Sequence, residues 1–451
     1  MPAAAAASRG SCSPLLFFMV PWVVLSTFNV GFGISELNPL QRVLTCRGAA
    51  PHGWLPACFA LSEAGFGILT ALFTLGGFVS SLLLSPLRAR FGLTKRATLL
   101  AATVVGSAGA ALQAFSWSVA ALGAGRALMG MGAGVGVAVV PGYLNDISPP
   151  ALRGPVGVAN QLSIVLGILL AQALGVSPLG SAPAESSAPQ PGGLARWRFV
   201  PLFSLGVQLL QLLGASLACE SPAEAPAHKR VELRARLGAD VHSEGAAEEE
   251  EALLSSEPRN DTAWPAEEPL EIPALLNITL RGGKDVRERE TRRGVVLIMG
   301  TLVAQQLSGV NAVLYFSSSI MADALGGGEN ERNAKLIALG ITVVNALMTF
   351  PPMYLISESR LGRRGLLLSS SSSMALSSLA LGLGILYAVP WLSAVALVAV
   401  VAGFSIGLGP VPFLILPELV EPRVRLVCCM RRTSLTSSPR RRALRRRSAS
   451  R

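Results

Sequence analysis

Long apolar stretches recur along the chain, separated by shorter polar segments. A helix that spans a bilayer needs about 20 consecutive apolar residues. Windows of that kind cover residues 15–35, 65–87, 97–117, 119–142, 155–176, 197–217, 294–321, 335–357, 367–389 and 391–416. The pattern predicts an all-α polytopic membrane protein, with six helices before a long polar interval and four after it.

Composition agrees with this fold class. The 451 residues are 51% hydrophobic and only 14% charged, whereas a soluble domain averages about 25% charged residues. That is too few charges to cover a soluble globule. The 46 glycines are spread through the apolar windows, as expected where membrane helices pack closely.

Lysine and arginine placement predicts a cytoplasmic N-terminus, because loops rich in these residues stay on the cytoplasmic side. The loops after the second, fourth and eighth windows are the richer ones; they contain Arg88, Arg90, Lys95, Arg96, Arg153, Arg360, Arg363 and Arg364. The resulting organisation is a cytoplasmic N-terminus (1–14), a six-helix half (15–218), a cytoplasmic linker (219–293), a four-helix half (294–418) and a basic low-complexity tail (419–451).

The two segments outside the helices are strongly polar. The linker has a run of four glutamates at 248–251 and many prolines, and it is too polar to bury a core. Its EEEALL sequence resembles an acidic dileucine sorting signal, so we expect either the plasma membrane or a vacuolar or lysosomal membrane. Residues 421–451 hold eleven arginines and one glutamate. This tail is suited to anionic lipid headgroups; without interleaved aromatic residues it does not indicate nucleic-acid binding.

Cysteine and histidine positions give no sign of catalysis. Cys46 and Cys58 fall in one external loop, where they could pair, but we expect two free thiols. The three histidines (52, 228 and 242) lie in loops, and no nucleophile–base arrangement or metal-ligand spacing is present. We therefore expect no enzyme activity, no metal and no cofactor.

Amide side chains inside the apolar windows are the candidate chemistry. Gln161 and Gln172 are eleven residues apart and share one helical face. They face either a polar transport path or a neighbouring helix that they hydrogen-bond. Buried amides in a membrane are costly unless satisfied, so they usually face a cavity or a bundle interior.

The stretch QQLSGVNAVLYFSS adds a second set of amides at 305–318. On a straight helix Gln306 and Asn311 would point about 140° apart, and Ser308-Gly309 between them is a natural place for the helix to unwind. Asn345 supplies another amide, and GLGPVPF at 407–413 marks a second flexible helix. Amides donate and accept hydrogen bonds without charge, which suits neutral polyhydroxyl ligands.

Five segments resemble the sugar porter family of the major facilitator superfamily, in the family's order. They are GRALMGMGAGVGVAVVPGYLNDISPPALRG (125–154), CESPAEA (219–225), QQLSGVNAVLYFSS (305–318), LGRRG (361–365) and GLGPVPFLILPEL (407–419). The resemblance implies a major facilitator bundle in which sugar hydroxyls are bound by Gln161, Gln305, Gln306, Asn311 and Asn345. Phe413 stands where the family usually has a tryptophan that stacks on the sugar.

The resemblance also implies a cytoplasmic gate of charged residues, which are Arg90, Asp146, Arg153, Glu220, Arg363, Arg364 and Glu418. Several neighbouring positions depart from the family pattern: Ala89 and Ser359 replace acids, and Ala223 replaces an arginine. The match stops near Glu418, so the family's eleventh and twelfth helices are missing and we expect a truncated reading frame.

Taken together, these features predict transport of a hexose-like sugar or polyol by alternating access in the lipid bilayer. Proton-coupled relatives carry an aspartate where this chain has Gly33, which favours facilitated diffusion. The alternatives are a proton-coupled sugar symporter, a non-transporting sugar sensor and an inactive truncated product.

Overall fold

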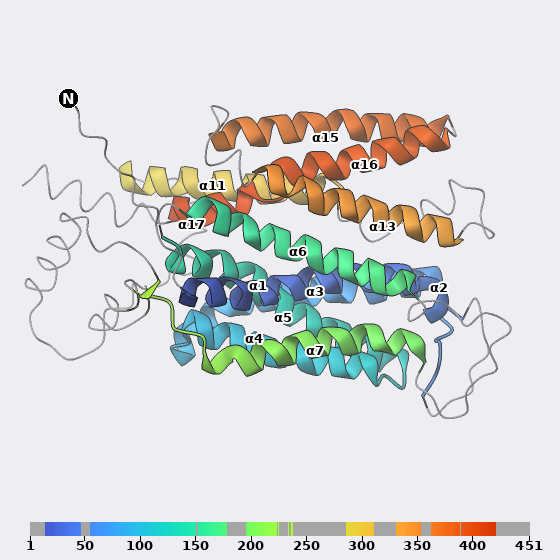
Figure 1. Cartoon of the computed structure of the whole chain (residues 1–451), viewed down its shortest axis with the longest axis horizontal. Coiled ribbons are helices and arrows are strands. Elements are labelled where there is room, and N and C mark those ends of the chain that lie inside the picture. Colours follow the sequence, from blue (N-terminus) through green and yellow to red (C-terminus); the bar gives the residue numbers. More distant parts are fainter. Residues whose placement is uncertain are drawn as a thin grey trace, which may run out of the picture.

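The computed structural model describes residues 14–46, 55–149, 152–177, 195–222, 224, 233, 236–237, 286–310, 331–352, 362–387 and 389–420. Within these ranges the regular secondary structure is helical, without strands, and short turns and irregular segments connect the helices. The helices run roughly parallel to one another and form two groups that follow the order of the chain (Figure 1).

The first group is built from the N-terminal part of the chain. It contains α1 (Pro14–Ser35), η1 (Asn38–Leu40), α2 (Gln41–Leu44), α3 (Glu63–Phe91), α4 (Lys95–Ala114), α5 (Val119–Ile147), α6 (Arg153–Val176), η2 (Arg196–Arg198), α7 (Phe199–Leu213) and η3 (Gly214–Ser216). Side-chain oxygens of Ser62, Thr94 and Ser118 accept hydrogen bonds from the first turns of α3, α4 and α5. These caps fix where three of the long helices begin, because they satisfy backbone donors that have no partner within the helix.

The second group contains α11 (Val286–Leu307), α13 (Glu331–Met348), α15 (Gly362–Leu386), α16 (Pro390–Ile406) and α17 (Val411–Val420). Helix α6 lies at the boundary and packs against α13 and α17 (Figure 1). The two groups therefore meet along α6, which makes this helix the place to look for a site shared between them.

Eight helices of the described residues are long and apolar enough to cross a membrane, and α11 and α13 contribute shorter apolar segments at Val296–Leu307 and Leu336–Pro352. These ten segments match the ten predicted windows, and the polytopic fold class is confirmed. Helix α11 begins at Val286 rather than 294, because the charged residues before the apolar segment include arginine and glutamate, which are good helix formers. Most of the predicted linker, and the tail after 420, lie outside the described residues.

Glycines let the helices of the first group touch backbone to backbone. A Cβ added at Gly31 of α1 would lie 1.8 Å from the carbonyl oxygen of Ile164 in α6. A Cβ at Gly130 of α5 would lie 2.0 Å from the carbonyl oxygen of Phe73 in α3. Hydrocarbon offers no solvent from which apolar surfaces are driven together, so close packing of this kind is a main source of helix association in membranes.

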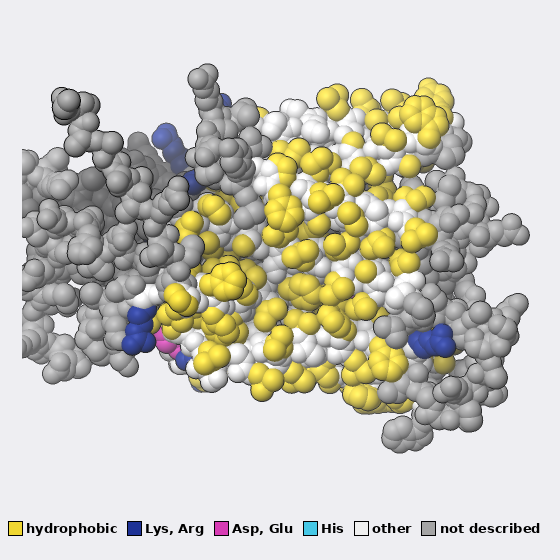
Figure 2. All heavy atoms as spheres, viewed as in Figure 1, with side chains coloured by type: hydrophobic (Ala, Val, Ile, Leu, Met, Phe, Trp, Pro, Cys, Tyr) yellow, Lys and Arg dark blue, Asp and Glu magenta, His cyan; other side chains and the backbone are white. Residues whose placement is uncertain are grey.

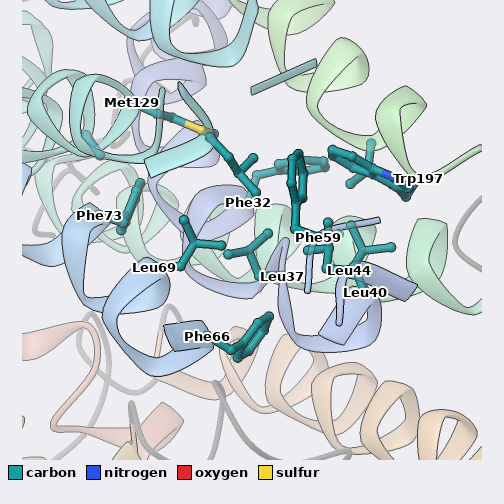
Figure 3. Close-up of a cluster of buried hydrophobic side chains, with 14 of the residues drawn as sticks. Phe32, Leu37, Leu40, Leu44, Phe59, Phe66, Leu69, Phe73, Met129 and Trp197 are labelled. Carbon is teal, nitrogen blue, oxygen red and sulfur yellow. The ribbon is translucent and has the colours of Figure 1, made fainter. Parts of the chain in front are cut away.

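A cluster of buried apolar side chains fills one end of the first group. It includes Phe32, Leu40, Phe59, Phe73 and Trp197 (Figure 3). Trp197 donates a hydrogen bond from Nε1 to the carbonyl oxygen of Ala57 at 2.7 Å, so the segment before α3 is held over the cluster.

Cys46 and Cys58 form a disulfide at the same end, with their Cα atoms 5.2 Å apart. The prediction of two free thiols is wrong. The chain between α2 and α3 folds back on itself, and the backbone N–H of Phe59 donates to the carbonyl oxygen of Leu44 at 2.8 Å. That return places the two cysteines side by side, which their separation of 12 residues in the sequence did not reveal.

The two ends of the bundle differ in chemistry. We call the end that carries Cys46–Cys58 the disulfide end, and the opposite end, where α3 ends and α4 and α6 begin, the charged end. Apolar side chains cover the helical body between the two ends (Figure 2). This distribution is that of an integral membrane protein whose ends contact water.

Candidate functional site

The last apolar segment of the second group is interrupted at residues 407–410, between α16 and α17. Gly407 is required there, because an added Cβ would lie 2.3 Å from the carbonyl oxygen of Leu366 in α15. Ser370 of α15 accepts a hydrogen bond from the backbone N–H of Leu408 at 3.0 Å and donates one to the carbonyl oxygen of Gly403 at 2.7 Å. Pro410 has no backbone N–H. The sequence GLGP thus produces a fixed break rather than a disordered one.

Gln305, near the end of α11, lies against this break. Its Nε2 donates to the carbonyl oxygens of Leu408 at 3.0 Å and Gly409 at 3.5 Å. These carbonyls lie where the regular helix is interrupted, so they can accept a hydrogen bond from a side chain. Helix α11 itself ends directly afterwards at Leu307, and Gly309 has a positive φ of 77°. The predicted unwinding at Ser308-Gly309 is confirmed.

Gln161 comes to the same break from the first group of helices. It is buried on α6, and its Nε2 lies 3.2 Å from the position that a Cβ on Gly409 would occupy. Asn345 of α13 approaches one turn earlier, where its Oδ1 accepts a hydrogen bond from Ser405 Oγ at 2.5 Å. Three of the predicted amides, from three helices, therefore meet around residues 405–409.

The structure says less about the other three predicted sugar-contacting residues. Phe413 is half-buried on α17, two residues after the start of that helix, and Gln306 is exposed on α11. Asn311 lies outside the described residues. The sequence did not single out Ser370 and Ser405, whose hydroxyls hold the break and Asn345. They lie in apolar windows where serine is common, so no sequence signal distinguishes them.

Apolar side chains flank the amides toward the disulfide end. Ile164 and Ile168 of α6 are in one buried cluster with Val310, Phe404 and Leu408 from the second group. Toward the charged end, Leu414 of α17 fits against Gly157, where an added Cβ would lie 2.0 Å from its Cδ2. The amides around the break thus lie between two apolar contacts that join the two groups of helices.

Ion pairs gather at the charged end, where the loop between α3 and α4 meets α5 and the segment after α7. They join Arg88 to Glu224 at 2.6 Å, Lys95 to Asp146 at 2.5 Å, and Arg96 to Glu220 at 3.2 Å. Ser221 Oγ also donates to Asp146. We call these six charged residues the ion-pair cluster; it links elements of the first group only.

The predicted gate residues fall partly in this cluster. Asp146 and Glu220 belong to it. Arg90 is exposed, and the ion pair with Glu224 is made by Arg88, two residues earlier on α3. Arg153 is half-buried and its Nε makes no hydrogen bond. Arg363 and Arg364 are exposed on α15, and the side chain of Glu418 lies outside the description. The segment RARFGLTKR (88–96) contains Arg88, Arg90 and Lys95. Only the rotational position of each arginine on α3 shows that Arg88, and not Arg90, faces the acid.

A buried ion pair lies next to the apolar cluster that contains Phe73. Arg126 of α5 is 3.5 Å from Glu36 Oε2, and both side chains are at most 1% exposed. Arg126 also donates to the carbonyl oxygen of Gly33 at 2.9 Å and lies over the ring of Phe73, 4.7 Å from its centroid. Through these contacts the pair joins α1, α3 and α5. A charge buried away from water is costly without a partner, so the two residues depend on each other.

Comparison with known proteins gives a consistent result. The chain matches the family described as Sugar (and other) transporter over residues 25–435. It is 28% identical over 419 residues to a probable metabolite transport protein of Saccharomyces cerevisiae, covering 88% of this chain and 79% of that one. It is 32% identical over 427 residues to facilitated glucose transporter member 4 of solute carrier family 2 from Mus musculus, covering 88% and 74%.

Solved structures show the same fold. The xylose transporter XylE from E. coli, in a partially occluded inward open conformation, superposes with a TM-score of 0.65 at 20% identity, covering 89% of this chain and 87% of that one. The proton:xylose symporter XylE bound to 6-bromo-6-deoxy-D-glucose gives a TM-score of 0.67 at 19% identity, covering 90% and 83%. The helical bundle is therefore that of the major facilitator superfamily.

Proposed function

Because this chain belongs to the Sugar (and other) transporter family, we propose that it carries a hexose-like sugar or a related polyol across a membrane by alternating access. The observation that supports this most directly is the meeting of Gln161, Gln305 and Asn345 around the break between α16 and α17. Uncharged amides from both groups of helices are suited to hydroxyl groups, which both donate and accept hydrogen bonds. Gln306, Asn311 and Phe413 complete the proposed sugar site.

Relatives support the choice of substrate class. The mouse relative is a facilitated glucose transporter, and the E. coli protein of the same fold is a xylose transporter. Interrupted helices whose freed backbone groups lie at a cavity are a common way for transporters to build a site in mid-membrane.

Alternating access needs contacts that open on one side while those on the other stay closed. Two contacts between the groups of helices are suited to this role: the Ile164–Phe404 cluster on one side of the amides, and Leu414 against Gly157 on the other. At the charged end the ion-pair cluster links α3, α4 and α5 to the segment after α7. Arg90, Arg153, Arg363, Arg364 and Glu418 are proposed to pair with it in other stages of the cycle.

Facilitated diffusion is the proposed energetics. Among the described residues, those that contact the break between α16 and α17 are neutral amides, hydroxyls and apolar groups. A second candidate is proton-coupled symport, which the buried Glu36–Arg126 pair favours, since an ionisable pair inside a membrane is a functional-site hypothesis by default.

The chemistry of the two ends supports a proposed orientation and membrane. A disulfide persists in an oxidising compartment, which supports an extracellular or lumenal disulfide end. The cationic residues of the opposite end support a cytoplasmic charged end and N-terminus. The membrane is proposed to be the plasma membrane or, through the EEEALL segment, a vacuolar or lysosomal one.

The test is sugar counterflow in proteoliposomes that contain the purified full chain. We expect saturable uptake of radiolabelled D-glucose or D-xylose, competed by unlabelled sugar, with no accumulation when a pH gradient is imposed. Accumulation that depends on the gradient would favour symport instead. Sugar binding without flux would indicate a sensor, and neither binding nor flux with any hexose, pentose or polyol would refute the proposal.

A further inference from the structure

Gln172 of α6 is a buried amide for which the described bundle provides no partner. Its side chain is 1% exposed, and neither Oε1 nor Nε2 makes a hydrogen bond. An amide without a partner is costly in an apolar environment, at several times the value of an ordinary hydrogen bond. The sequence left open whether Gln172 binds a neighbouring helix or faces a polar path. The structure excludes the first possibility for this conformation.

Helix geometry places Gln172 on the side of α6 that meets the second group of helices at Gln161 and Ile168. It is eleven residues after Gln161, which brings the two amides onto the same side of the helix about 16 Å apart. Ile168 lies between them on that side, in the cluster with Val310, Phe404 and Leu408. Gln172 therefore lies beyond the apolar contact, nearer the disulfide end.

The order along this face is amide, apolar contact, amide. A sugar that travels between the disulfide end and the break at 407–410 must pass the apolar contact, where it finds no hydrogen-bonding side chain on α6. Gln172 is the next amide on this face, and because it is 1% exposed in this conformation, a sugar reaches it when the helices separate at the disulfide end. Its two N–H donors and its carbonyl oxygen are matched to vicinal hydroxyl groups.

We propose that Gln172 forms an outer sugar subsite, which holds a hydroxylated substrate on the disulfide side of the Ile168 contact before it reaches Gln161 and Gln305. The subsite rests on the proposed sugar transport and adds a second binding position to it. A substrate hydroxyl supplies the hydrogen bonds that Gln172 lacks when the site is empty.

Asn160 provides a matched comparison on the same helix. It is also 1% exposed, and its Oδ1 and Nδ2 likewise make no hydrogen bond. It shares a face with Ser163, which donates to the carbonyl oxygen of Val24, and with Gly167, whose added Cβ would lie 2.1 Å from the carbonyl oxygen of Phe28. Asn160 thus faces α1 rather than the second group, and the proposal assigns it no sugar contact.

The experiment measures KM for D-glucose and D-xylose separately from each face, in sealed vesicles of known orientation. The variants are Gln172→Met, which keeps the side-chain volume but removes the amide oxygen and the N–H donors, Gln172→Asn, which keeps a shorter amide, and Asn160→Leu as the control. For Gln172→Met we expect KM from the disulfide face to rise roughly three- to tenfold, the effect of losing one neutral hydrogen bond. KM from the charged face should change less than about twofold, and Gln172→Asn should recover part of the loss.

Each outcome decides the matter. If the ratio of the two KM values is unchanged in Gln172→Met, the outer subsite is overturned while transport by the wild type still stands. The same conclusion follows if Asn160→Leu changes this ratio as much as Gln172→Met does. If the wild type moves no sugar from either face, the proposed function fails and the subsite with it. If Gln172→Met does not fold, the same ratio measured in Gln172→Asn carries the decision.

Discussion

Gln305 Nε2 donates a hydrogen bond to the carbonyl oxygen of Leu408 at 3.0 Å, although the two residues are 103 positions apart in the chain. The bond joins the end of α11 to the break between α16 and α17. It places a side chain with further hydrogen-bonding capacity directly at that break. Loss of Gln305 therefore affects both the shape of the proposed site and its contact with a sugar.

Replacement Gln305→Leu is expected to lower kcat/KM for sugar by about tenfold or more, since it removes at least one hydrogen bond from the helix break and one from the substrate. Counterflow in proteoliposomes measures the change. Thr301→Val on the same helix is the control, because the Thr301 hydroxyl bonds only to the carbonyl of Leu297 in its own helix. Equal activity of the two variants would contradict the assignment of Gln305.

Close packing of α1 on α6 gives a prediction about stability. Gly31→Ala places a methyl group 1.8 Å from the backbone carbonyl oxygen of Ile164, so the two helices must separate, at a cost of about 1–3 kcal/mol or more. Gly67→Ala on α3 meets nothing within 4 Å and should leave the thermal midpoint unchanged or raised. Thermal unfolding in detergent compares the two. A Gly31→Ala protein as stable as Gly67→Ala would show that this contact is absent in solution.

At the charged end, Asp146→Asn removes the ion pair to Lys95, where the Asp146 side chain is only 7% exposed. We expect a loss of about 1–3 kcal/mol, because Lys95 is left without its acid. Exchanging the two residues, Lys95→Asp with Asp146→Lys, should recover part of it. The single variants Lys95→Asp and Asp146→Lys, together with the exchange, form a double-mutant cycle that thermal unfolding measures. Strictly additive losses would argue against a direct interaction.

The disulfide at the opposite end is expected to stabilise the loop over the apolar cluster of Figure 3. Replacement of both cysteines by serine, Cys46→Ser with Cys58→Ser, should lower stability by about 2–3 kcal/mol, the entropic value for a short closed loop. Cys219→Ser is the control, because Cys219 is a free thiol on the charged side of α7. Thiol labelling of the denatured protein, with and without reductant, tests whether the bond forms in cells.

A further double-mutant cycle on the buried pair compares Glu36→Gln, Arg126→Met and the double variant by thermal unfolding. Glu36→Gln leaves the Arg126 charge buried without its carboxylate partner, and we expect a loss of about 3–5 kcal/mol. Neutralising both residues, Glu36→Gln with Arg126→Met, should restore part of that stability, although the bond from Arg126 to Gly33 is then lost as well. In the symport alternative, Glu36→Gln would also abolish sugar accumulation driven by a pH gradient. A facilitated-diffusion transporter shows no such accumulation, with or without the substitution.

The sequence by itself determined the class of this protein, because membrane insertion depends on local hydrophobicity. Each apolar window is long enough to cross the bilayer wherever it packs, so the number and order of the helices follow from the composition of each window. Helix breaks at Ser308-Gly309 and at GLGP are local in the same way, since glycine and proline change the backbone where they stand. Gln161, Gln305 and Asn345 were identifiable as amides in apolar surroundings.

Only the tertiary structure decided which of these groups meet. Gln305 reaches Leu408 and Ser405 reaches Asn345 through packing between distant helices, and no local pattern encodes such contacts. The rotation of α3 pairs Arg88 rather than Arg90 with the acids, and the return of the chain at Phe59 joins Cys46 to Cys58. Gln161 and Gln172 look alike in the sequence, yet Gln161 lies at the helix break, whereas Gln172 is buried without a hydrogen-bond partner among the described residues. Partners and burial are properties of the packed bundle, which is why the sequence names the candidates and the fold assigns them.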